Sequence, residues 1–316
     1  MVHSIKEFPL VFTGNWNKDL VLSACKEAGY CLGKSDVSKF SDGEVKVVLQ
    51  EHMRGKDVIF VQSTSPPTSD NLVELLYMIS AASRAGAKHI TAIIPYFGYS
   101  RQDRKCLEGS NISASDVARM LELMGVNRVV TFDLHSAMCQ GFFGPKVQVD
   151  NFFVHHAFLE HLAGLSKVSI VSPDAGAYER AMKFFDIFAA EFPHCDVRSA
   201  IVFKQRVAAN VIGKAELVGD VDGRDTIIVD DIVDTAGTLC NAADLLFEYG
   251  AKSVMAVVTH GILSGPAVDR IKKCRINKLL ITDSIKHSDA ILSDGKIKVV
   301  SLYEEIANIL SDIQAT

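Results

Sequence analysis

The sequence has no apolar run of about 18 residues, and residues 1–6 lack the hydrophobic region of a signal peptide. Its seven cysteines are scattered and include no C-x-x-C pair, which argues against a disulfide framework and a structural zinc site. The net charge is −5 and no Lys/Arg cluster exceeds a few residues, so the footprint of a nucleic-acid-binding protein is missing. These absences predict a cytoplasmic protein that binds neither membranes nor nucleic acid.

Two common phosphate-binding motifs are also missing. Neither G-x-x-x-x-G-K-[ST] nor G-x-G-x-x-G occurs, which disfavours the ordinary kinase and dinucleotide-enzyme folds. With so small a net charge, an anionic substrate has to be held by local groups rather than by a global field. Any phosphate chemistry therefore needs another scaffold.

Strand and helix patterns alternate along the whole chain. The 316 residues are 48% apolar, which suggests two domains that each bury a core. Near-continuous apolar strands, such as 90–94, 128–132 and 168–172, alternate with amphipathic helices. This order predicts an α/β fold in which each domain has a mainly parallel sheet flanked by helices.

Two stretches about half a chain apart repeat one pattern. In the first, a strand at 57–62 leads to a helix, to Gly86-Ala-Lys88 and to the next strand. In the second, a strand at 226–229 leads to a helix, to Gly250-Ala-Lys252 and to the next strand. The shared corner favours duplication of an α/β domain. We place the boundary near Asp150, which gives domains 1–150 and 151–316.

The most informative segment is 227–238, where an apolar strand leads into Asp230 and Asp231 and then into small residues that open a helix. Small residues at 235–238 let backbone N–H groups close around a phosphate at the positive end of the helix dipole. The carboxylates, at the strand's exit, can accept two ribose hydroxyls. The segment closely resembles the phosphoribosyl-pyrophosphate motif of the type I phosphoribosyltransferase fold.

The plainer interpretation is that Asp234 or Thr235 caps the helix while the preceding acids are solvated turn residues. It does not explain a carboxylate pair that follows a buried strand directly.

Other polar residues also follow predicted strands. Arg101-Gln-Asp103-Arg-Lys105 is either an exposed basic turn or a triphosphate clamp, because arginine presents a rigid fork to phosphate oxygens. His135 and Asp174 could each be structural, yet together, near a phosphate loop, they are candidate Mg²⁺ ligands.

For two segments, the periodicity of the sequence does not decide the function. Phe40-Ser-Asp-Gly-Glu44 is typical of a hairpin corner. Lys204-Gln-Arg206, after a strand at 200–203, fits a mobile catalytic flap as well as a strand edge guarded by cations.

Eight short blocks, in this order and at compatible spacing, resemble the ribose-phosphate pyrophosphokinase family, also called phosphoribosyl-pyrophosphate synthetases, over nearly the whole chain. The blocks are Phe40–Glu44, Asp70-Asn-Leu-Val-Glu-Leu-Leu76, Arg101–Asp103, Asp133–His135, Ser172–Gly176, Lys204-x-Arg206, Val229–Thr238 and Thr259-His-Gly. The resemblance implies two tandem type I phosphoribosyltransferase-like domains, with 1–150 on the ATP side and 151–316 on the ribose 5-phosphate side. The last helix is expected to pack back on the N-terminal domain.

The same resemblance implies transfer of the β,γ-diphosphoryl group of ATP to the anomeric hydroxyl of ribose 5-phosphate. It assigns the catalytic role to Lys204 and Arg206, on a flap that could also include Asn210, and Mg²⁺ binding to His135 and Asp174. ATP would be bound by Phe40, Asp42, Glu44, Arg101, Gln102 and Asp103, and ribose 5-phosphate by Asp230, Asp231, Asp234, Thr235, Ala236, Gly237 and Thr238. Because Phe40, Asp42 and Glu44 would come from a neighbouring subunit, a homo-oligomer built from dimers, up to a hexamer, is expected.

Two segments depart from the family pattern. Ala177 stands where a second glycine is more common, and 106–111 replaces a loop that helps to form a regulatory phosphate and ADP site.

Two other functions compete: a phosphoribosyltransferase, which has no reason to carry Arg101-Gln-Asp103, and a non-catalytic regulatory subunit of the same family. Retention of His135, Asp174, Lys204 and Arg206 argues against the second.

Overall fold

The computed structural model describes residues 8–208 and 211–315, except the side chains of 204–208, 211–215 and 315. The chain folds into two compact units. The first comprises Met1–Phe153, Ser284–Lys286 and Ser301–Thr316, and the second comprises Val154–Asp283 and His287–Val300. No helix of the described residues is long and apolar enough to cross a membrane.

The first unit is built on a five-stranded parallel sheet in the order β1-β4-β5-β6-β7. Its strands are β1 (Leu10–Phe12), β4 (Asp57–Val61), β5 (His89–Ile94), β6 (Arg128–Phe132) and β7 (Gln148–Phe152). Its helices are α1 (Lys18–Glu27), α2 (Thr68–Arg84), α3 (Ser113–Met124), the 3-10 helix η1 (Ala137–Phe142) and α8 (Tyr303–Ala315).

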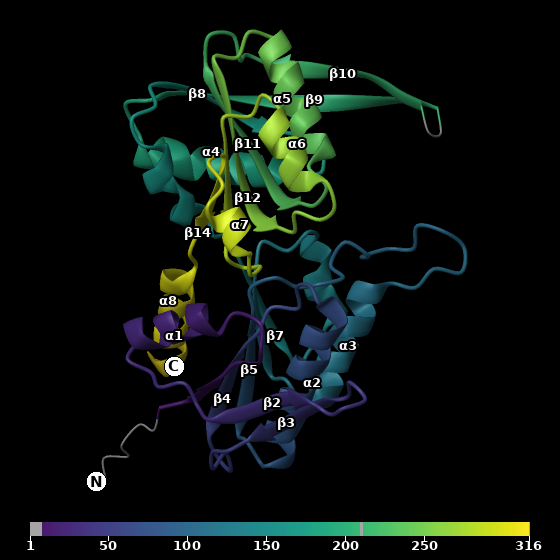
Figure 1. The fold of residues 1–316 in the computed structure, drawn as a ribbon, viewed down its shortest axis with the longest axis vertical. Helices are drawn as coiled ribbons and strands as arrows, with labels where there is room; N and C mark the ends of the chain where they lie inside the picture. The colour runs from purple at the N-terminus through teal and green to yellow at the C-terminus, as the bar shows by residue number, and fades with distance from the viewer. Residues whose placement is uncertain (1–7, 209–210, 316) are drawn as a thin grey trace. The chain divides into compact units, whose positions relative to one another are not determined.

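Apolar side chains of α2 and α3 pack on one face of this sheet. Leu75 and Leu121 are fully buried there against Phe60 and Ile94. Helix α8 packs against α1 (Figure 1), and the Tyr30 hydroxyl donates a hydrogen bond to the Leu310 carbonyl at 3.1 Å. The C-terminal helix therefore belongs to the first unit, where it contacts the N-terminal helix α1.

A separate antiparallel hairpin, β2 (Ser35–Lys39) and β3 (Val45–Leu49), also belongs to the first unit. Val37 and Val47 are paired across it and pack against the core that contains α2. The predicted corner, Phe40 to Glu44, is the turn between the two strands.

The second unit has a seven-stranded sheet in the order β10-β9-β8-β11-β12-β13-β14, in which only the β9–β10 pair is antiparallel. Its strands are β8 (Lys167–Ser172), β9 (Asp196–Ala208), β10 (Val211–Gly219), β11 (Asp225–Val233), β12 (Ser253–Gly261), β13 (Lys278–Thr282) and β14 (Ile297–Val300). Its helices are the 3-10 helix η2 (His155–Leu162), α4 (Tyr178–Glu191), α5 (Gly237–Glu248), α6 (Ala267–Lys273) and α7 (Asp289–Leu292).

Alternate residues of β11 face two different helical layers. Ile227 and Val229 pack with α4 side chains such as Phe184, whereas Ile228 packs with Leu239 of α5 and the helices on the other face. A strand that is buried on both faces has no polar side, and this explains the continuous apolar run at 227–229.

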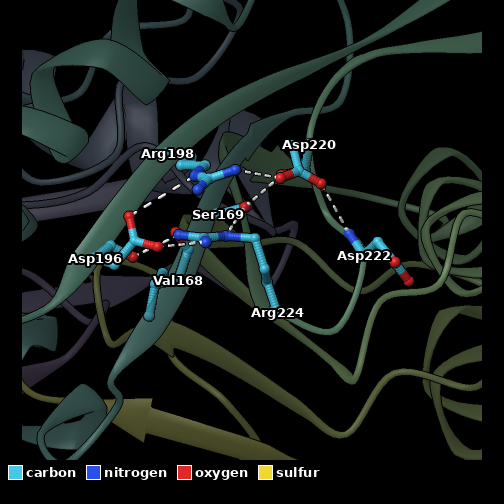
Figure 2. Close-up of polar contacts among 7 residues, drawn as sticks. All are labelled: Val168, Ser169, Asp196, Arg198, Asp220, Asp222 and Arg224. Carbon is cyan, nitrogen blue, oxygen red and sulfur yellow. Dashed lines mark hydrogen bonds and ion pairs between the residues drawn. The ribbon is translucent and has the colours of Figure 1, made fainter.

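A buried arginine ties together the amino ends of three strands in this sheet (Figure 2). Arg224, 3% exposed, donates from Nε to Ser169 Oγ at 2.9 Å and from Nη2 to the Val168 carbonyl at 2.9 Å. Its Nη1 donates to Asp196 Oδ2 at 2.7 Å, and this hydrogen bond is the main reason why the pKa of Asp196 is lowered. The buried charge is therefore paired and hydrogen-bonded, at the edge opposite to the residues predicted to bind ligands.

The predicted strands and helices are largely present. β5 contains the whole predicted strand 90–94 and begins one residue earlier, β4 ends one residue before the predicted Gln62, and α2 ends just before Gly86, whose φ is +82°. Two predicted ends in the second unit are wrong. β11 continues beyond the predicted 229 to Val233, and β9 continues beyond the predicted 203 to Ala208.

Candidate active site

The extra length of β11 changes the place of the carboxylate pair. Asp230 and Asp231 lie inside the strand, where Asp230 is paired with Val258 of β12, and not at the strand's exit as predicted. The last pair between β11 and β8 is Ile228 with Val171. The acids therefore lie just beyond the point where one neighbouring strand has stopped pairing, which opens that side of β11 near its carboxyl end.

Asp231 is held by an arginine from α4. It continues the alternation of the β11 residues that face this helix, and its Oδ1 lies 3.4 Å from Nη1 of Arg180. Asp231 is 4% exposed and Arg180 is 8% exposed, so the ion pair is almost fully removed from water. Arg180 also lies 4.0 Å from Oδ1 of Asp230. One guanidinium therefore serves two carboxylates.

Burial and the neighbouring carboxylate perturb Asp230. Burial, followed by the negative charge of Asp231, raises the pKa of the Asp230 carboxyl well above its usual range, and Arg180 only partly opposes the shift. Asp230 Oδ1 also accepts a hydrogen bond from the Asp231 N–H at 2.9 Å. A ligand that donates hydroxyl hydrogens to both carboxylates would relieve their repulsion.

The turn after β11 has the form expected of a phosphate loop. Ala236 precedes the first residue of α5 and has a φ of +60°, in the left-handed region that non-glycine residues seldom occupy. The N-cap residue of α5 is therefore Ala236, which makes no side-chain cap hydrogen bond, and not Asp234 or Thr235. Ala236 offers no side-chain acceptor to the first N–H groups of α5, and such groups can point toward an anion.

Two residues after β12 brace this loop. Ser264 donates a hydrogen bond to a carboxylate oxygen of Asp234, and Arg270 of α6 donates to the Thr235 carbonyl at 2.9 Å. Neither Ser264 nor Arg270 was predicted, because both are about thirty residues from the loop. Arg180 was missed for the same reason: it is on α4, whereas its partners, Asp230 and Asp231, lie far along the sequence on β11.

The loop after β8 gives Asp174 a turn-forming role. Its Oδ1 accepts hydrogen bonds from the N–H groups of Gly176 at 2.9 Å and Ala177 at 3.2 Å, just before α4 begins. Both hydrogen bonds described for the carboxylate are on Oδ1, so Oδ2 is the atom that could meet a metal ion.

In the first unit, the residues after β5 line a cleft of about 490 Å³. Arg101 and Gln102, both predicted to bind ATP, line it together with Tyr99 at a φ of +65°. Gln102 Oε1 accepts a hydrogen bond from Ser113 at the start of α3, at 2.7 Å. Asp103 is not among the lining residues.

Gly98 lets the backbone after β5 approach the backbone at Thr64 closely. A Cβ added at Gly98 would lie 2.3 Å from the Thr64 carbonyl oxygen, so no larger residue fits without moving the backbone. The close approach places the cleft beside the loop that follows β4.

His135 follows β6 and is exposed, two residues after Asp133, whose φ is +43°. Within the residues that the structure describes, no group of three or more His, Cys, Asp or Glu side chains could hold a metal ion. A cation that takes few protein ligands and fills its shell with water and phosphate oxygens, as Mg²⁺ does, would not need such a group.

The hairpin tip presents Phe40 to solvent. Its side chain is 54% exposed, and its backbone exchanges hydrogen bonds with Glu44 and Gly43 at 2.8 and 2.9 Å. Asp42 Oδ1 accepts from the Glu44 N–H at 3.1 Å, so Asp42 shapes the turn. Within this unit, an exposed aromatic ring on a rigid turn is available to a ligand or to another chain.

Lys204 and Arg206 lie within β9, and not after a strand as predicted. They are paired with Ala215 and Ile212 of β10, in the part of the hairpin that contains register shifts. Their side chains, like Asn210, lie outside what the structure describes. In Figure 1 the β9–β10 hairpin reaches out past helices α5 and α6 of its own unit.

Among the described residues, four that are not glycine have a positive φ, and all four follow parallel strands. Tyr99 follows β5, Asp133 follows β6, Ala236 follows β11 and Leu263 follows β12. Such residues cost about 1–3 kcal/mol each and tend to cluster at functional sites. Their positions mark the carboxyl edges of both sheets, where ligands of open α/β folds bind.

Comparison with known proteins relates the whole chain to one family. A family model described as the N-terminal domain of ribose phosphate pyrophosphokinase matches residues 10–125, and one described as the phosphoribosyl synthetase-associated domain matches residues 196–315. The chain is 46% identical over 308 residues to the ribose-phosphate pyrophosphokinase of Burkholderia pseudomallei (strain K96243), covering 96% of this chain and 94% of that one.

Two further similarities agree. Identity to the ribose-phosphate pyrophosphokinase of Vibrio parahaemolyticus serotype O3:K6 is 44% over 306 residues, covering 96% of this chain and 95% of that one. The crystal structure of phosphoribosylpyrophosphate synthetase from Mycobacterium smegmatis matches with a TM-score of 0.87 at 33% identity, covering 97% of this chain and 99% of that one.

Proposed function

The chain belongs to the ribose-phosphate pyrophosphokinase family and forms phosphoribosyl pyrophosphate, and we propose how the residues of its two units carry out this reaction. The β,γ-diphosphoryl group of ATP passes to the anomeric hydroxyl of ribose 5-phosphate. The hydroxyl loses its proton to solvent as its oxygen bonds to the β-phosphorus. The bond from that phosphorus to the bridging oxygen breaks, its electron pair stays on that oxygen, and AMP leaves.

Ribose 5-phosphate is held by the second unit. Asp230 and Asp231 accept hydrogen bonds from the ribose hydroxyls, and the turn from Asp234 to Thr238 surrounds the 5-phosphate with backbone N–H groups. The observation that carries this assignment is the pair of carboxylates that share Arg180, directly before a left-handed turn and an uncapped helix start. An uncapped helix start favours an anion, whereas two crowded carboxylates favour hydroxyl donors.

ATP is held by the first unit at the cleft that Arg101 and Gln102 line, where a guanidinium can bind phosphate oxygens. Asp103, the next residue along the chain, also takes part in ATP binding. Phe40, Asp42 and Glu44 serve the adenine of a neighbouring subunit, which makes the protein a homo-oligomer based on dimers. The exposure of Phe40 on its hairpin supports this role.

His135 and Asp174 are the residues that would hold Mg²⁺. When bound, Mg²⁺ neutralises phosphate charge as the diphosphoryl group is transferred. Lys204 and Arg206 supply positive charge to the same group and stabilise the negative charge that develops on its oxygens. No covalent intermediate with the protein is required. We further propose that the protein works in the cytoplasm.

The deciding experiment is a product assay. Pure protein is mixed with ribose 5-phosphate and Mg-ATP, and the nucleotide products are separated. We expect AMP in equal amount to phosphoribosyl pyrophosphate, and no AMP when ribose 5-phosphate is omitted. ADP as the main product would contradict transfer of a diphosphoryl group.

A matched pair of variants tests the sugar site. Asp231→Asn should reduce AMP formation at limiting ribose 5-phosphate, whereas Asp186→Asn, on α4 away from the candidate site, should not. Equal activity of both variants would contradict the assignment of Asp231. A pure protein with no AMP formation under any condition would favour the regulatory-subunit alternative.

A further inference from the structure

The block from Asp70 to Leu76, which carries part of the family resemblance, has no role in the proposed reaction. It lies in the first half of α2, beside the β2–β3 hairpin. Asp70 and Glu74 are four residues apart, so they share one face of the helix. Asp70 Oδ2 pairs with Nζ of Lys39, the last residue of β2, at 2.6 Å.

Glu74 is a buried carboxylate with three hydrogen-bond donors around it. It is 4% exposed, and it accepts from the Asn15 N–H at 2.9 Å, from Asn15 Nδ2 at 2.7 Å and from Gln62 Nε2 at 3.2 Å. A carboxylate without its proton only accepts hydrogen bonds, and every contact described for Glu74 matches that requirement. Bonds of this kind are stronger than those between neutral groups.

The chain around Asn15 is shaped to reach this carboxylate. A Cβ added at the preceding Gly14 would lie 2.6 Å from Glu74 Oε2 and 3.1 Å from Gln62 Oε1. The Gly14 N–H donates to Gln62 Oε1 at 3.2 Å. A larger residue at position 14 would therefore have to displace the Glu74 side chain, whereas glycine permits the close approach of the turn after β1 to α2.

Asn15 extends this arrangement to the hairpin. Its Nδ2 group has two hydrogens: one is donated to Glu74 Oε1 at 2.7 Å, and the other to the Val37 carbonyl in β2 at 3.0 Å. Val37 is three residues before Phe40 at the hairpin tip. Glu74 thus reaches β2 through one amide group, while Asp70 reaches it directly through Lys39.

We propose that Glu74, with Asp70, is a positioning residue that sets the place of the β2–β3 hairpin, so that Phe40 is correctly presented to the nucleotide. The nucleotide part of this inference rests on the proposed function. Of the two residues, Glu74 is expected to contribute more to the placement of the hairpin. The Lys39 and Asp70 side chains are 44% and 41% exposed, and an exposed pair contributes little.

The test substitution is Glu74→Gln, which keeps the shape of the side chain but replaces one acceptor oxygen by an NH₂ group that faces donors. We expect the KM for ATP to rise about tenfold, with the KM for ribose 5-phosphate and kcat unchanged. Asp70→Asn should raise the KM for ATP less than threefold. Glu122→Gln is the matched control, since Glu122 also accepts a backbone N–H, from Gly144 at 3.1 Å, but has no described contact with the hairpin.

A double-mutant cycle separates positioning from general destabilisation. If Glu74 acts through the hairpin, Glu74→Gln should add little to the KM for ATP in a protein that already carries Phe40→Ala. Additive effects would overturn the proposal. If Glu74→Gln fails to fold, Asn15→Ala removes the link at an exposed side chain and takes its place in the cycle.

Hydrogen exchange gives a readout that does not depend on the nucleotide. Residues 35–49 should exchange faster in Glu74→Gln than in the parent, while β5 and β6 keep their protection. Unchanged exchange at 35–49 would overturn the proposal. So would faster exchange with an unchanged KM for ATP, provided that Phe40→Ala raises that KM. If Phe40→Ala leaves the KM unchanged, the ATP role of Phe40 in the proposed function fails, and exchange alone then decides the positioning role.

Discussion

The two units have nearly the same geometry where a helix returns to the sheet. Gly86 and Gly250 have φ values of +82° and +87°, and their carbonyls accept hydrogen bonds from Gly55 and Gly223 at 2.8 and 2.9 Å. One asparagine in each unit repeats a further contact: Asn127 Oδ1 accepts from the Ile90 N–H and Asn277 Oδ1 from the Val254 N–H, both at 2.8 Å. The amino edges of the two sheets therefore share detailed hydrogen bonding, which supports duplication.

The carboxyl edges differ in chemistry. Counted from Asp57 and Asp225, the first residues of β4 and β11, the slots of Gln62 and Ser63 correspond to those of Asp230 and Asp231. Ser63 Oγ accepts from the Tyr96 N–H at 2.8 Å and donates to the Ser284 carbonyl at 2.6 Å. In the first unit, the hydroxyl of Ser63 is thus hydrogen-bonded to other residues of the same unit. In the second unit, two carboxylates lie at the corresponding positions beside one arginine. The amino edges of the two sheets, which are alike, provide the scaffold, and the carboxyl edges, which differ, carry the functional residues.

The largest effect is expected in the part of the second unit that the first unit's sheet does not repeat, the antiparallel β9–β10 pair. Lys204→Ala should lower kcat by about 10²- to 10³-fold, or about 3–4 kcal/mol, with a smaller change in KM, because this cation acts on charge that appears in the transition state. Steady-state kinetics is the measurement, with Lys146→Ala, at an exposed lysine of the first unit, as control. A kcat equal to the parent's would remove Lys204 from the catalytic group.

The second largest effect is expected when Asp231 is replaced by serine, the residue that stands at the corresponding position, 63, of the first unit. Asp231→Ser should weaken ribose 5-phosphate binding by about 10- to 100-fold while ATP binding stays nearly intact, because a charged hydrogen-bond acceptor is lost. Calorimetry with each ligand separately checks this, and Ser63→Ala is the matching variant of the first unit. Similar losses for both ligands would indicate a metal or folding role for Asp231.

A smaller effect tests the first unit's own contribution. His135→Ala should raise the Mg²⁺ concentration for half-maximal activity by about tenfold, because His135 is proposed as one of only two protein ligands. His194→Ala, on the segment between α4 and β9, is the control. A Mg²⁺ titration that overlays the parent's would leave His135 with a structural role.

The smallest effect concerns stability and pH. The pKa of Asp230 is raised in the folded protein, so the folded state holds its proton more tightly than the unfolded state, and stability falls as pH rises from the ordinary aspartate pKa through the raised one. Asp230→Asn, which makes this slot neutral like Gln62, should therefore stabilise the protein by about 1 kcal/mol at neutral pH. Denaturant unfolding at several pH values checks this. The advantage should shrink as the pH is lowered through that window, and a constant difference would exclude the charge explanation.

Sequence alone predicted the strands whose burial is continuous and whose ends carry turn residues. The predicted strand at 90–94 lies within β5, and the helix before Gly86 is α2, because apolar spacing and a left-handed glycine are local signals. The ends of β9 and β11 were wrong because each strand continues through polar residues. Pairing with β10 and β12 holds those residues in the sheet, and no local pattern reports it.

The candidate site shows the same limit. Asp230, Asp231 and the loop that follows are contiguous, so their sequence indicated a phosphosugar site. Arg180 and Arg270 act on that segment from other elements, and their contacts depend on how helices pack on a sheet. The roles assigned to individual site residues, and the division of ATP and ribose 5-phosphate between 1–150 and 151–316, stay predictions.

The membership of α8 in the first unit has a consequence for synthesis on the ribosome. Domains usually fold in the order in which they emerge, N-terminal first. In this chain every residue of the second unit emerges before α8, which packs against α1 and accepts the hydrogen bond of Tyr30 at Leu310. The unit that begins first is therefore completed last, and a nascent chain should protect the backbone of β11 from hydrogen exchange while α1 still lacks its partner helix.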